Sequence, residues 1–386
     1  MNDGQDALEQ YLFIASDPER RSFASHAVIG NEAADLDSIV SAVVAAFALT
    51  TIHGVLYLPV VHMDRMDFLP MRREFSALLR WVAGSHCDRV VSLMTGCIVF
   101  LSDEKELNQL LPGNFLLVDH NVPTGIFAKV RVTGVIDHHE LQGGSIPAVE
   151  PFILERVGSC GSLVFREYRK LLGSFAIKLL LGVAALDTYR NSKEREADLA
   201  LFSCAHENLE ISSSDIDAIG GHLKAVRDDQ DFWLSLNVTQ RLKMDFKSFD
   251  GGELGGSTVR ISMVQLLGMR SQEDDSSESN ELPNSLESIV RFGSSYRLFF
   301  VLADGKHHRQ VLFYSREPGL LDALEGLLLA DTELQAKPKK GMASKLNASS
   351  SPGSDFRVFT ILNKQKASRK VVAPMLSGFL KSRPKA

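Results

Sequence analysis

The first half of the chain alternates short runs of β-branched and aromatic residues with segments of helical composition. The runs are apolar along their whole length, which is typical of strands buried on both faces of a parallel sheet. They lie at residues 26–30, 55–61, 97–101, 115–118 and 132–136. Parallel strands need long crossover connections, usually helices, so this order predicts an α/β fold.

A second α/β region follows a polar stretch at 206–215, which we expect to be a linker. The first domain would then span 1–205 and the second, smaller domain 216–386. The pattern predicts helices around 215–230 and 319–330, with strands near 257–266, 296–303 and 309–314. Two segments without apolar periodicity, 271–285 and 336–354, are expected to be mobile insertions.

The cysteine usage and the N-terminal composition favour a reducing compartment. None of the four cysteines forms a CxxC pair, and the chain starts with acidic residues rather than a basic start and an apolar block. We therefore expect a cytoplasmic location, with an organellar pool still open. The uncharged stretch 38–63 is interrupted by His53-Gly54 and Pro59, which predicts a buried helix and a strand rather than membrane insertion.

The charge is distributed unevenly. The net charge is −6, yet the last fifty residues carry twelve Lys or Arg against one acidic residue, Asp355. The remaining body is strongly acidic, and there is no RNA-recognition aromatic motif. We therefore expect no nucleic-acid partner.

Three polar clusters follow predicted strands directly. Asn31, Asp35 and Asp37 follow the first strand, Asp119 follows the strand at 115–118, and Asp137-His138-His139-Glu140 follows the strand at 132–136. The first cluster alone is better explained by helix capping, with Asp37 or Ser38 as the N-cap, and a single Asp after a strand is common. The adjacent histidines flanked by carboxylates are more specific, because imidazole binds divalent metals and a neighbouring carboxylate fixes its tautomer.

Together these clusters predict a metal site. In α/β sheets, ligands bind beyond the carboxyl ends of the strands, where the clusters lie. Asp187, after an apolar helix at about 174–186, adds a further carboxylate. Oxygen donors with one or two imidazoles suit Mg²⁺, Mn²⁺ or Co²⁺, and this number of ligands suggests two ions that share a carboxylate, as in phosphoryl transfer.

With four such motifs in order, the chain resembles the DHH phosphoesterase superfamily over nearly its whole length. The resemblance is to the branch of exopolyphosphatases, prune-type proteins and family II inorganic pyrophosphatases, which carry a second-type DHH-associated domain. The segment 367–374, with Ser368-Arg369-Lys370, is similar to the substrate loop of that domain. The resemblance implies a parallel-sheet N-terminal domain, a smaller C-terminal α/β domain with a mixed sheet, and an active site in the cleft between them.

The resemblance also implies roles for individual residues. Asp35 would bind one metal and Asp37 the other, Asp119 would bridge both, and His138 and Asp187 would complete the second site. The implied catalytic residues are Asp119, His138 and His139, with His139 facing the substrate phosphate. The implied substrate-binding residues are Asn31, Arg72, His139, Lys224, Arg369 and Lys370. Asn31 stands where family II pyrophosphatases have a metal-binding His, which disfavours a pyrophosphatase and indicates two Mg²⁺ ions, with Mn²⁺ or Co²⁺ as alternatives.

The resulting hypothesis is an exopolyphosphatase. It would hydrolyse the terminal phosphoanhydride of inorganic polyphosphate with a hydroxide activated by two metal ions, releasing orthophosphate. The basic C-terminal region would then help to bind a polyanionic substrate. An inorganic pyrophosphatase or a short-chain or nucleotide phosphohydrolase, with cyclic-nucleotide phosphodiesterase side activity, is the enzymatic alternative. A prune-like protein-interaction scaffold is the alternative of another class, and the oligomeric state stays open.

Overall fold

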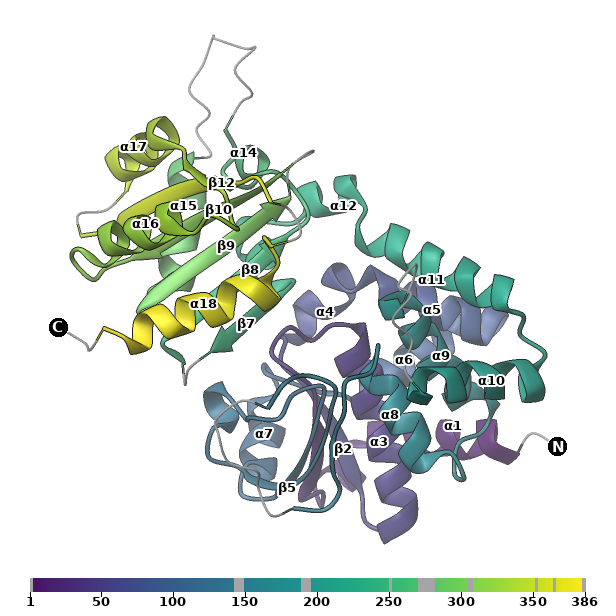
Figure 1. Cartoon of the computed structure of the whole chain (residues 1–386). Coiled ribbons are helices and arrows are strands. Elements are labelled where there is room, and N and C mark those ends of the chain that lie inside the picture. Colours follow the sequence, from purple (N-terminus) through teal and green to yellow (C-terminus); the bar gives the residue numbers. More distant parts are fainter. Residues whose placement is uncertain are drawn as a thin grey trace. The chain divides into compact units, whose positions relative to one another are not determined.

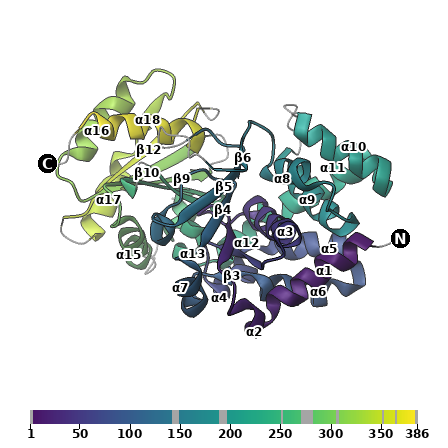
Figure 2. The ribbon, with the colours of Figure 1, turned by 90° about the horizontal axis from the view of Figure 1, so that it is seen from below.

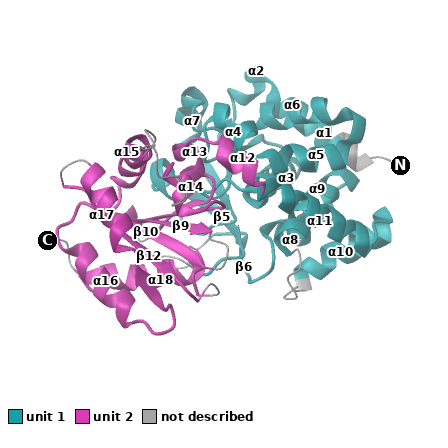
Figure 3. Ribbon diagram, turned by 90° about the horizontal axis from the view of Figure 1, so that it is seen from above, with its two compact units in different colours: residues 1–228 teal, residues 229–386 magenta. Residues whose placement is uncertain are grey.

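The chain forms two compact units, seen here in a computed structural model. Unit 1 comprises residues 1–228 and unit 2 residues 229–386 (Figure 1, Figure 3). The structure describes residues 3–141, 149–188, 196–249, 252–269, 282–304, 308–350, 353–363 and 366–383.

Unit 1 contains a six-stranded sheet in which every neighbouring pair of strands is parallel. The strand order is β3-β2-β1-β4-β5-β6. The chain therefore builds outward from β1 in one direction and then in the other, with a topological switch point between β1 and β4. The strands are β1 (His26–Ile29), β2 (Tyr57–Val61), β3 (Val99–Phe100), β4 (Asn114–Val118), β5 (Arg131–Asp137) and β6 (Phe152–Leu154). The predicted parallel α/β sheet is confirmed, although the short edge strand β6 was not predicted.

Eleven α-helices accompany the sheet in the described part of unit 1. They are α1 (Asp3–Ser16), α2 (Pro18–Arg21), α3 (Leu36–His53), α4 (Arg65–Met71), α5 (Arg73–Ala83), α6 (Cys87–Cys97), α7 (Glu104–Leu110), α8 (Cys160–Tyr168), α9 (Ser174–Thr188), α10 (Glu196–Leu209) and α11 (Ser213–Arg227). Two 3₁₀ turns, η1 (Gly84–His86) and η2 (Gly125–Phe127), complete the unit.

Helix α3 is the central helix of the core of unit 1. It packs against β1 and β2 and against helices α8 and α9 (Figure 2), and every residue from Leu36 to Leu49 is buried. Gly54 ends the helix in the left-handed region at φ 67°, where a residue without Cβ is favoured. The helix is long and apolar enough to cross a membrane by composition, but its burial within the unit is typical of a core helix.

The border between the units differs from the expected linker. The polar stretch at 206–215 holds the end of α10 and the start of α11, and α11 packs against α9 and α5 of unit 1. At Gly220 of α11 an added Cβ would lie 2.4 Å from the backbone oxygen of Ala185, so these helices approach closely. Ser212 and Asp215 form a capping box, which is why the stretch is polar. The division falls instead between Asp228 and Asp229.

Unit 2 contains a mixed six-stranded sheet of order β11-β12-β10-β9-β8-β7. Only β8 and β9 run parallel, and the other pairs are antiparallel. The strands are β7 (Phe246–Phe249), β8 (Leu254–Val259), β9 (Leu298–Asp304), β10 (Arg309–Ser315), β11 (Ala336–Pro338) and β12 (Asp355–Ile361). The predicted mixed α/β domain is confirmed.

The helices of unit 2 bury an apolar core on the sheet. They are α12 (Gln230–Ser235), α13 (Val238–Lys243), α14 (Met263–Leu266), α15 (Leu282–Gly293), α16 (Leu320–Ala330), α17 (Lys340–Ser349) and α18 (Arg369–Lys381). Apolar residues of α16 and α18 form one buried cluster with residues of β8, β9, β10 and β12.

The two predicted insertions have different outcomes. Residues 271–281 lie outside the described part of the chain, while 282–285 form the start of α15. The expectation of an irregular segment at 336–354 was wrong, because β11 pairs with β12 and α17 buries Ala343 and Leu346. Two buried side chains in a polar, Lys- and Ser-rich helix are too few to give a clear apolar period.

Candidate metal centre

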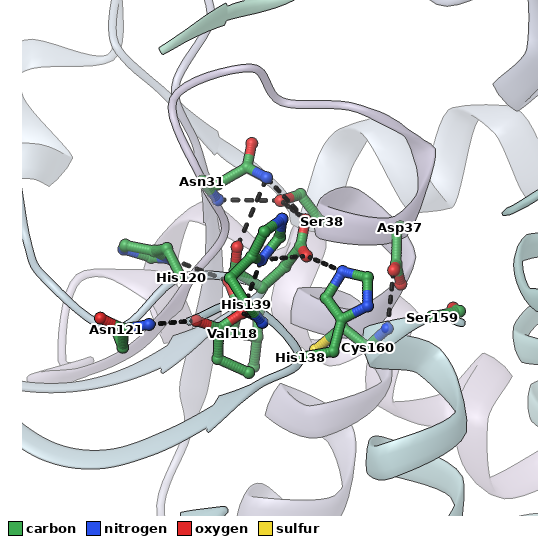
Figure 4. Close-up of polar contacts among 12 residues, drawn as sticks. Asn31, Asp37, Ser38, Val118, His120, Asn121, His138, His139, Ser159 and Cys160 are labelled. Carbon is green, nitrogen blue, oxygen red and sulfur yellow. Dashed lines mark hydrogen bonds and ion pairs between the residues drawn. The ribbon is translucent and has the colours of Figure 1, made fainter. Parts of the chain in front are cut away.

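The loops that follow β1 and β4 meet at the switch point of the sheet of unit 1. Asn31 follows β1 and Asp119 follows β4, and the Asn31 Nδ2 amide donates to Asp119 Oδ2 at 2.6 Å. Figure 4 shows Asn31 beside Ser38, whose hydroxyl oxygen accepts the backbone N–H of Asn31 at 2.8 Å. Ser38, in the first turn of α3, donates its hydroxyl to Asp119 Oδ2 at 2.8 Å. The structure therefore brings together two of the three predicted clusters through one carboxylate.

Asp119 presents its other oxygen to a histidine. Oδ1 lies 3.1 Å from Nε2 of His138 and, among the described residues, it accepts no hydrogen bond of normal geometry. The side chain is only 2% exposed, and its backbone has φ 61°, a region that Asp and Asn tolerate better than most residues. Burial and the charges of Asp35 and Asp37 raise the pKa of Asp119 to about 7.

His138 is oriented as a metal ligand would be. Its Nδ1 donates to the backbone oxygen of Val157 at 3.0 Å, which directs Nε2 towards Asp119. Burial lowers the pKa of His138, but the hydrogen bond and charge of Asp119 outweigh burial and raise this pKa to about 10. The Nε2 proton and a divalent cation thus compete for the same position beside the carboxylate.

His139 is held by a buried carboxylate of its own. Its Nδ1 donates to Asp137 Oδ1 at 2.8 Å, and its backbone N–H donates to the same oxygen at 3.1 Å. Asn121 donates to the other oxygen of Asp137 at 2.5 Å. Burial raises the pKa of Asp137, but the contacts with His139 outweigh it and keep this pKa below its usual range. Asp137 is therefore ionised and fixes the orientation of the His139 ring.

Asp37 joins α3 to the start of α8. Its two oxygens accept from the backbone N–H groups of Cys160 at 2.7 Å and Gly161 at 2.9 Å, and Ser41 donates to it at 3.1 Å. Ser159 caps the same helix. A carboxylate at a helix N-terminus is favoured by the helix dipole, so Asp37 keeps a fixed orientation with lone pairs left for a cation.

Asp35 and Asp187 bring the number of carboxylates at the centre to four. Asp35 is the N-cap of α3 and accepts from the backbone of Ser38 at 3.1 Å, whereas the capping interpretation expected Asp37 or Ser38 at this position. Burial, followed by the charges of Asp37 and Asp35, raises the pKa of Asp187 well above its usual range. Carboxylates packed together in a buried place favour either the protonated form or a nearby cation.

The donor set fits a divalent cation. Ligand atoms of Asp119, His138 and His139 lie within 4.8 Å of one another, and Asp119 Oδ1 is a buried oxygen that a cation would satisfy. Carboxylate oxygens with imidazole nitrogen suit Mg²⁺ or Mn²⁺. The other oxygen of Asp119 already accepts hydrogen bonds from Asn31 and Ser38.

Arg72 holds the loop before Asp35 and is not placed to meet a substrate. Its side chain is 1% exposed, its Nε donates to the backbone oxygen of Ala34 at 2.6 Å, and a second guanidinium nitrogen donates to that of Ala33. The substrate-binding role expected for Arg72 therefore becomes a positioning role in the structure. The family pattern alone could not distinguish a substrate-binding Arg from a positioning Arg, since either role places an Arg after β2.

Changing Arg72 to Met should lower stability more than most surface changes would. The variant leaves two buried backbone oxygens without their charged donor, which costs about 2–4 kcal/mol of unfolding free energy. Thermal unfolding of the purified variant measures this loss. An unfolding midpoint equal to that of the wild type would show that the guanidinium does not support the loop.

Lys224 also differs from its expected place. It lies on α11 in unit 1, not on the first helix of the second domain, and its Nζ pairs with Asp228 at 2.7 Å. Its neighbour Arg227 lies close enough to Asp187 for that carboxylate to raise the pKa of Arg227 against the opposing effect of burial. Arg227 is thus a cation of α11 close to the candidate centre, and sequence reasoning missed it.

In unit 2 the Ser-Arg-Lys segment begins helix α18. Arg369 donates to the backbone of Asp245 at 2.6 Å and pairs with its carboxylate at 2.7 Å, while Lys370 is exposed. Burial raises the pKa of Asp245, but Arg369, Lys247 and Arg260 together outweigh it and lower this pKa. Three cations therefore lie close to the Asp245 carboxylate, near the start of α18.

The residues that sequence reasoning missed are those that orient ligands. Ser38 and Asn121 lie in the same loops as the predicted clusters but were given no role at the metal site, and Asp137 was named beside the histidines without a role. Lys247 lies in edge strand β7, two residues after Asp245, and only the fold places it beside Arg369.

Comparison with known proteins finds a matching family model and several relatives of this chain. A family model described as the DHHA2 domain matches residues 229–379, nearly all of unit 2. The chain is 33% identical over 179 residues to a Schizosaccharomyces pombe protein described as an exopolyphosphatase, covering 45% of this chain and 44% of that protein. It is 31% identical over 164 residues to exopolyphosphatase PRUNE1 of Homo sapiens, covering 41% of this chain and 34% of that protein.

The fold has a solved counterpart. A Methanococcus jannaschii protein described as a family II inorganic pyrophosphatase superposes with a TM-score of 0.50 at 19% identity, over 92% of this chain and 99% of that chain. At that identity the likeness concerns the fold alone. The sequence matches span less than half the length of the two exopolyphosphatases named above.

Proposed function

This chain belongs to the DHH superfamily, in the exopolyphosphatase/prune branch whose C-terminal domain is DHHA2, and on that premise we propose that it hydrolyses phosphoanhydrides with the help of divalent metal ions. The preferred substrate in this proposal is inorganic polyphosphate, cleaved at its end to release orthophosphate. The exopolyphosphatase relatives support that choice of substrate.

One observation carries the proposal. The buried Oδ1 of Asp119 and Nε2 of His138 face each other at 3.1 Å, close to the charges of Asp35, Asp37 and Asp187. A structural ion pair would not need three further carboxylates close to it. A metal centre does need them, because each carboxylate offsets part of the charge of the cation.

We propose two divalent ions, Mg²⁺ in preference to Mn²⁺ or Co²⁺, with unequal affinities. The tighter ion is assigned to Asp119 Oδ1 and His138, with Asp37 and Asp187. The weaker one is assigned to Asp35, because Asn31 offers it no imidazole and Asp119 Oδ2 is engaged by Asn31 and Ser38. Bound divalent ions lower the pKa of water and neutralise phosphate charge.

The side chains around the ions have distinct tasks in this proposal. His139, held through Nδ1 by the ionised Asp137, donates a proton or hydrogen bond from Nε2 to a phosphoryl oxygen. Asn31 keeps Asp119 in its orientation. Arg369 and Lys370 bind further phosphates of the chain, the first as a planar fork and the second as a point charge. Lys247 and Arg260 add positive charge around Arg369.

A second enzymatic candidate is a pyrophosphatase or short-chain phosphohydrolase. A protein of Lactiplantibacillus plantarum described as a manganese-dependent inorganic pyrophosphatase is 24% identical over 196 residues. Asn31, which hydrogen-bonds Asp119 instead of offering an imidazole, favours the exopolyphosphatase. The prune-like scaffold would not need the intact pairing of Asp119 with His138.

A substrate panel tests the proposal. Purified protein with Mg²⁺ is given polyphosphates of several chain lengths, pyrophosphate, ATP and a cyclic nucleotide, and released orthophosphate is measured with malachite green. We expect the highest kcat/KM on polyphosphate. Hydrolysis of pyrophosphate alone would move the assignment to the pyrophosphatase, and no hydrolysis of any substrate would favour the scaffold.

Changing Arg369 to Ala should weaken substrate binding. The variant loses a charged fork at the start of α18, so we expect KM for polyphosphate to rise about tenfold to a hundredfold. Lys345→Ala is the matched control, since it removes one positive charge from an exposed position of the same unit. Its KM should stay within about twofold of the wild type. An equal rise of KM in the two variants would show that Arg369 contributes only general positive charge and does not bind the substrate directly.

A further inference from the structure

Asp198, on helix α10, is a buried carboxylate for which the proposed mechanism has no use. Its side chain is 0% exposed, and its Oδ2 accepts the backbone N–H of Gly158 at 2.6 Å. A buried carboxylate needs hydrogen-bond partners, so its place in the core needs a physical reason. The contact with Gly158 gives that reason, because Gly158 belongs to a short loop that touches the metal centre twice.

The loop formed by residues 157–161 contacts two of the candidate ligands. At one end, the backbone oxygen of Val157 accepts from His138 Nδ1 at 3.0 Å. At the other end, the backbone N–H groups of Cys160 and Gly161 donate to Asp37 at 2.7 Å and 2.9 Å. Asp198 is bonded to the residue between these contacts.

The packing at Gly158 leaves little room for movement. A Cβ added there would lie 2.3 Å from Cγ2 of Thr188 and 2.9 Å from Oδ2 of Asp198. The loop therefore lies directly on the end of α9 and on α10, and any larger side chain would displace it. A charge-assisted hydrogen bond and a close backbone approach fix the same residue.

We propose that Asp198 is a positioning residue of the metal centre. By holding Gly158, it fixes the Val157 carbonyl that orients His138 and the N–H groups that orient Asp37. One carboxylate outside the ligand set thus sets the direction of two candidate metal ligands, one directly after β5 and one in α3. The inference rests on the proposed function in that it requires the centre to bind a divalent ion.

The test is the affinity of the whole chain for Mn²⁺, measured by isothermal titration calorimetry without substrate. In Asp198→Ala the acceptor for Gly158 is lost, and we expect Mn²⁺ to bind about tenfold to a hundredfold more weakly. In Asp198→Asn one acceptor oxygen remains, so most of the affinity should return. Gly158→Ala, which displaces the loop by a different route, should weaken Mn²⁺ binding as Asp198→Ala does.

Leu201→Ala is the matched control, because Leu201 is buried on the same helix and has no bond to the loop. It should lower the thermal unfolding midpoint while leaving the Mn²⁺ affinity within about twofold of the wild type. Equal weakening in Leu201→Ala and Asp198→Ala would show a general loss of stability and overturn the proposal. Wild-type affinity in a folded Asp198→Ala variant, or in Gly158→Ala, would also overturn it.

The same titration distinguishes a failure of the positioning role of Asp198 from a failure of the proposed function. If the wild type binds Mn²⁺ and Asp198→Ala binds it equally well, only the positioning role fails. If the wild type binds no Mn²⁺, the proposed function fails and the positioning role fails with it. At saturating metal, Asp198→Ala should keep the KM for polyphosphate, because Asp198 acts on metal ligands and not on the substrate.

Discussion

Asp119→Asn is expected to abolish orthophosphate release, with kcat falling by about a thousandfold or more. The carboxylate is the buried charge that faces His138, and removing it takes away charge stabilisation worth about 4 kcal/mol in the transition state. Asn is the suitable replacement because the position has φ 61°, which Asn tolerates, and its oxygen can still accept from Asn31 and Ser38.

The same variant should not unfold the protein. One of several carboxylates that raise each other's pKa becomes neutral, so the metal-free variant should unfold at the wild-type midpoint or above it. Asp88→Asn on the exposed surface of α6 makes the same chemical change away from the centre and should leave kcat unchanged. Turnover close to wild type by Asp119→Asn would remove Asp119 from the mechanism.

Removal of divalent metal should have the second large effect. Protein treated with EDTA and dialysed should release no orthophosphate, and Mg²⁺ or Mn²⁺ should restore activity. A cation at the carboxylates binds the folded state, so saturation at about a hundred times Kd adds about 2.7 kcal/mol to the unfolding free energy. For a unit of this size the unfolding midpoint should rise by about 5–10 °C.

The thermal shift has a clear control. NaCl at the same ionic strength screens surface charges without occupying the centre, and it should raise the midpoint far less than Mg²⁺ does. Asp119→Asn should respond to Mg²⁺ much more weakly than the wild type. Full activity in EDTA, or identical shifts with Mg²⁺ and NaCl, would contradict a metal-dependent enzyme.

The sheet of unit 1 and its polar clusters were predictable because both are encoded in short, continuous segments of the sequence. Continuous apolar runs indicate parallel strands, and the rule that ligands bind at strand ends places Asn31 and Asp119 on the same edge of the sheet. The adjacency of β1 and β4, which lets the two side chains bond, needs the strand order. That order follows from how the whole unit packs and not from either motif.

The roles of Arg72 and Lys224 could not be predicted, for a physical reason. A buried Arg that holds backbone oxygens and an exposed Arg that binds phosphate have the same composition and similar neighbours in sequence. Only burial separates them, and burial depends on distant segments such as the 33–34 loop. Asp198 likewise looks like an ordinary residue in the first turn of a helix until the fold brings it to Gly158.

Helix capping explains the misplaced domain border. Ser212 and Asp215 have the composition of a linker, but their side chains bond the first turn of α11. Polar residues that cap helices and polar residues that link domains are alike in sequence. The apolar residues of α11, including the buried Ile219 and Leu223, are the signal that favours a packed helix.

The most direct test of the metal centre is the anomalous scattering of Mn²⁺ in crystals of the wild-type chain. We predict a strong peak between Oδ1 of Asp119 and Nε2 of His138, and its loss in Asp119→Asn crystals treated in the same way. Crystals saturated with Mn²⁺ that show no peak there, or show peaks only elsewhere on the chain, would contradict the assignment of this centre.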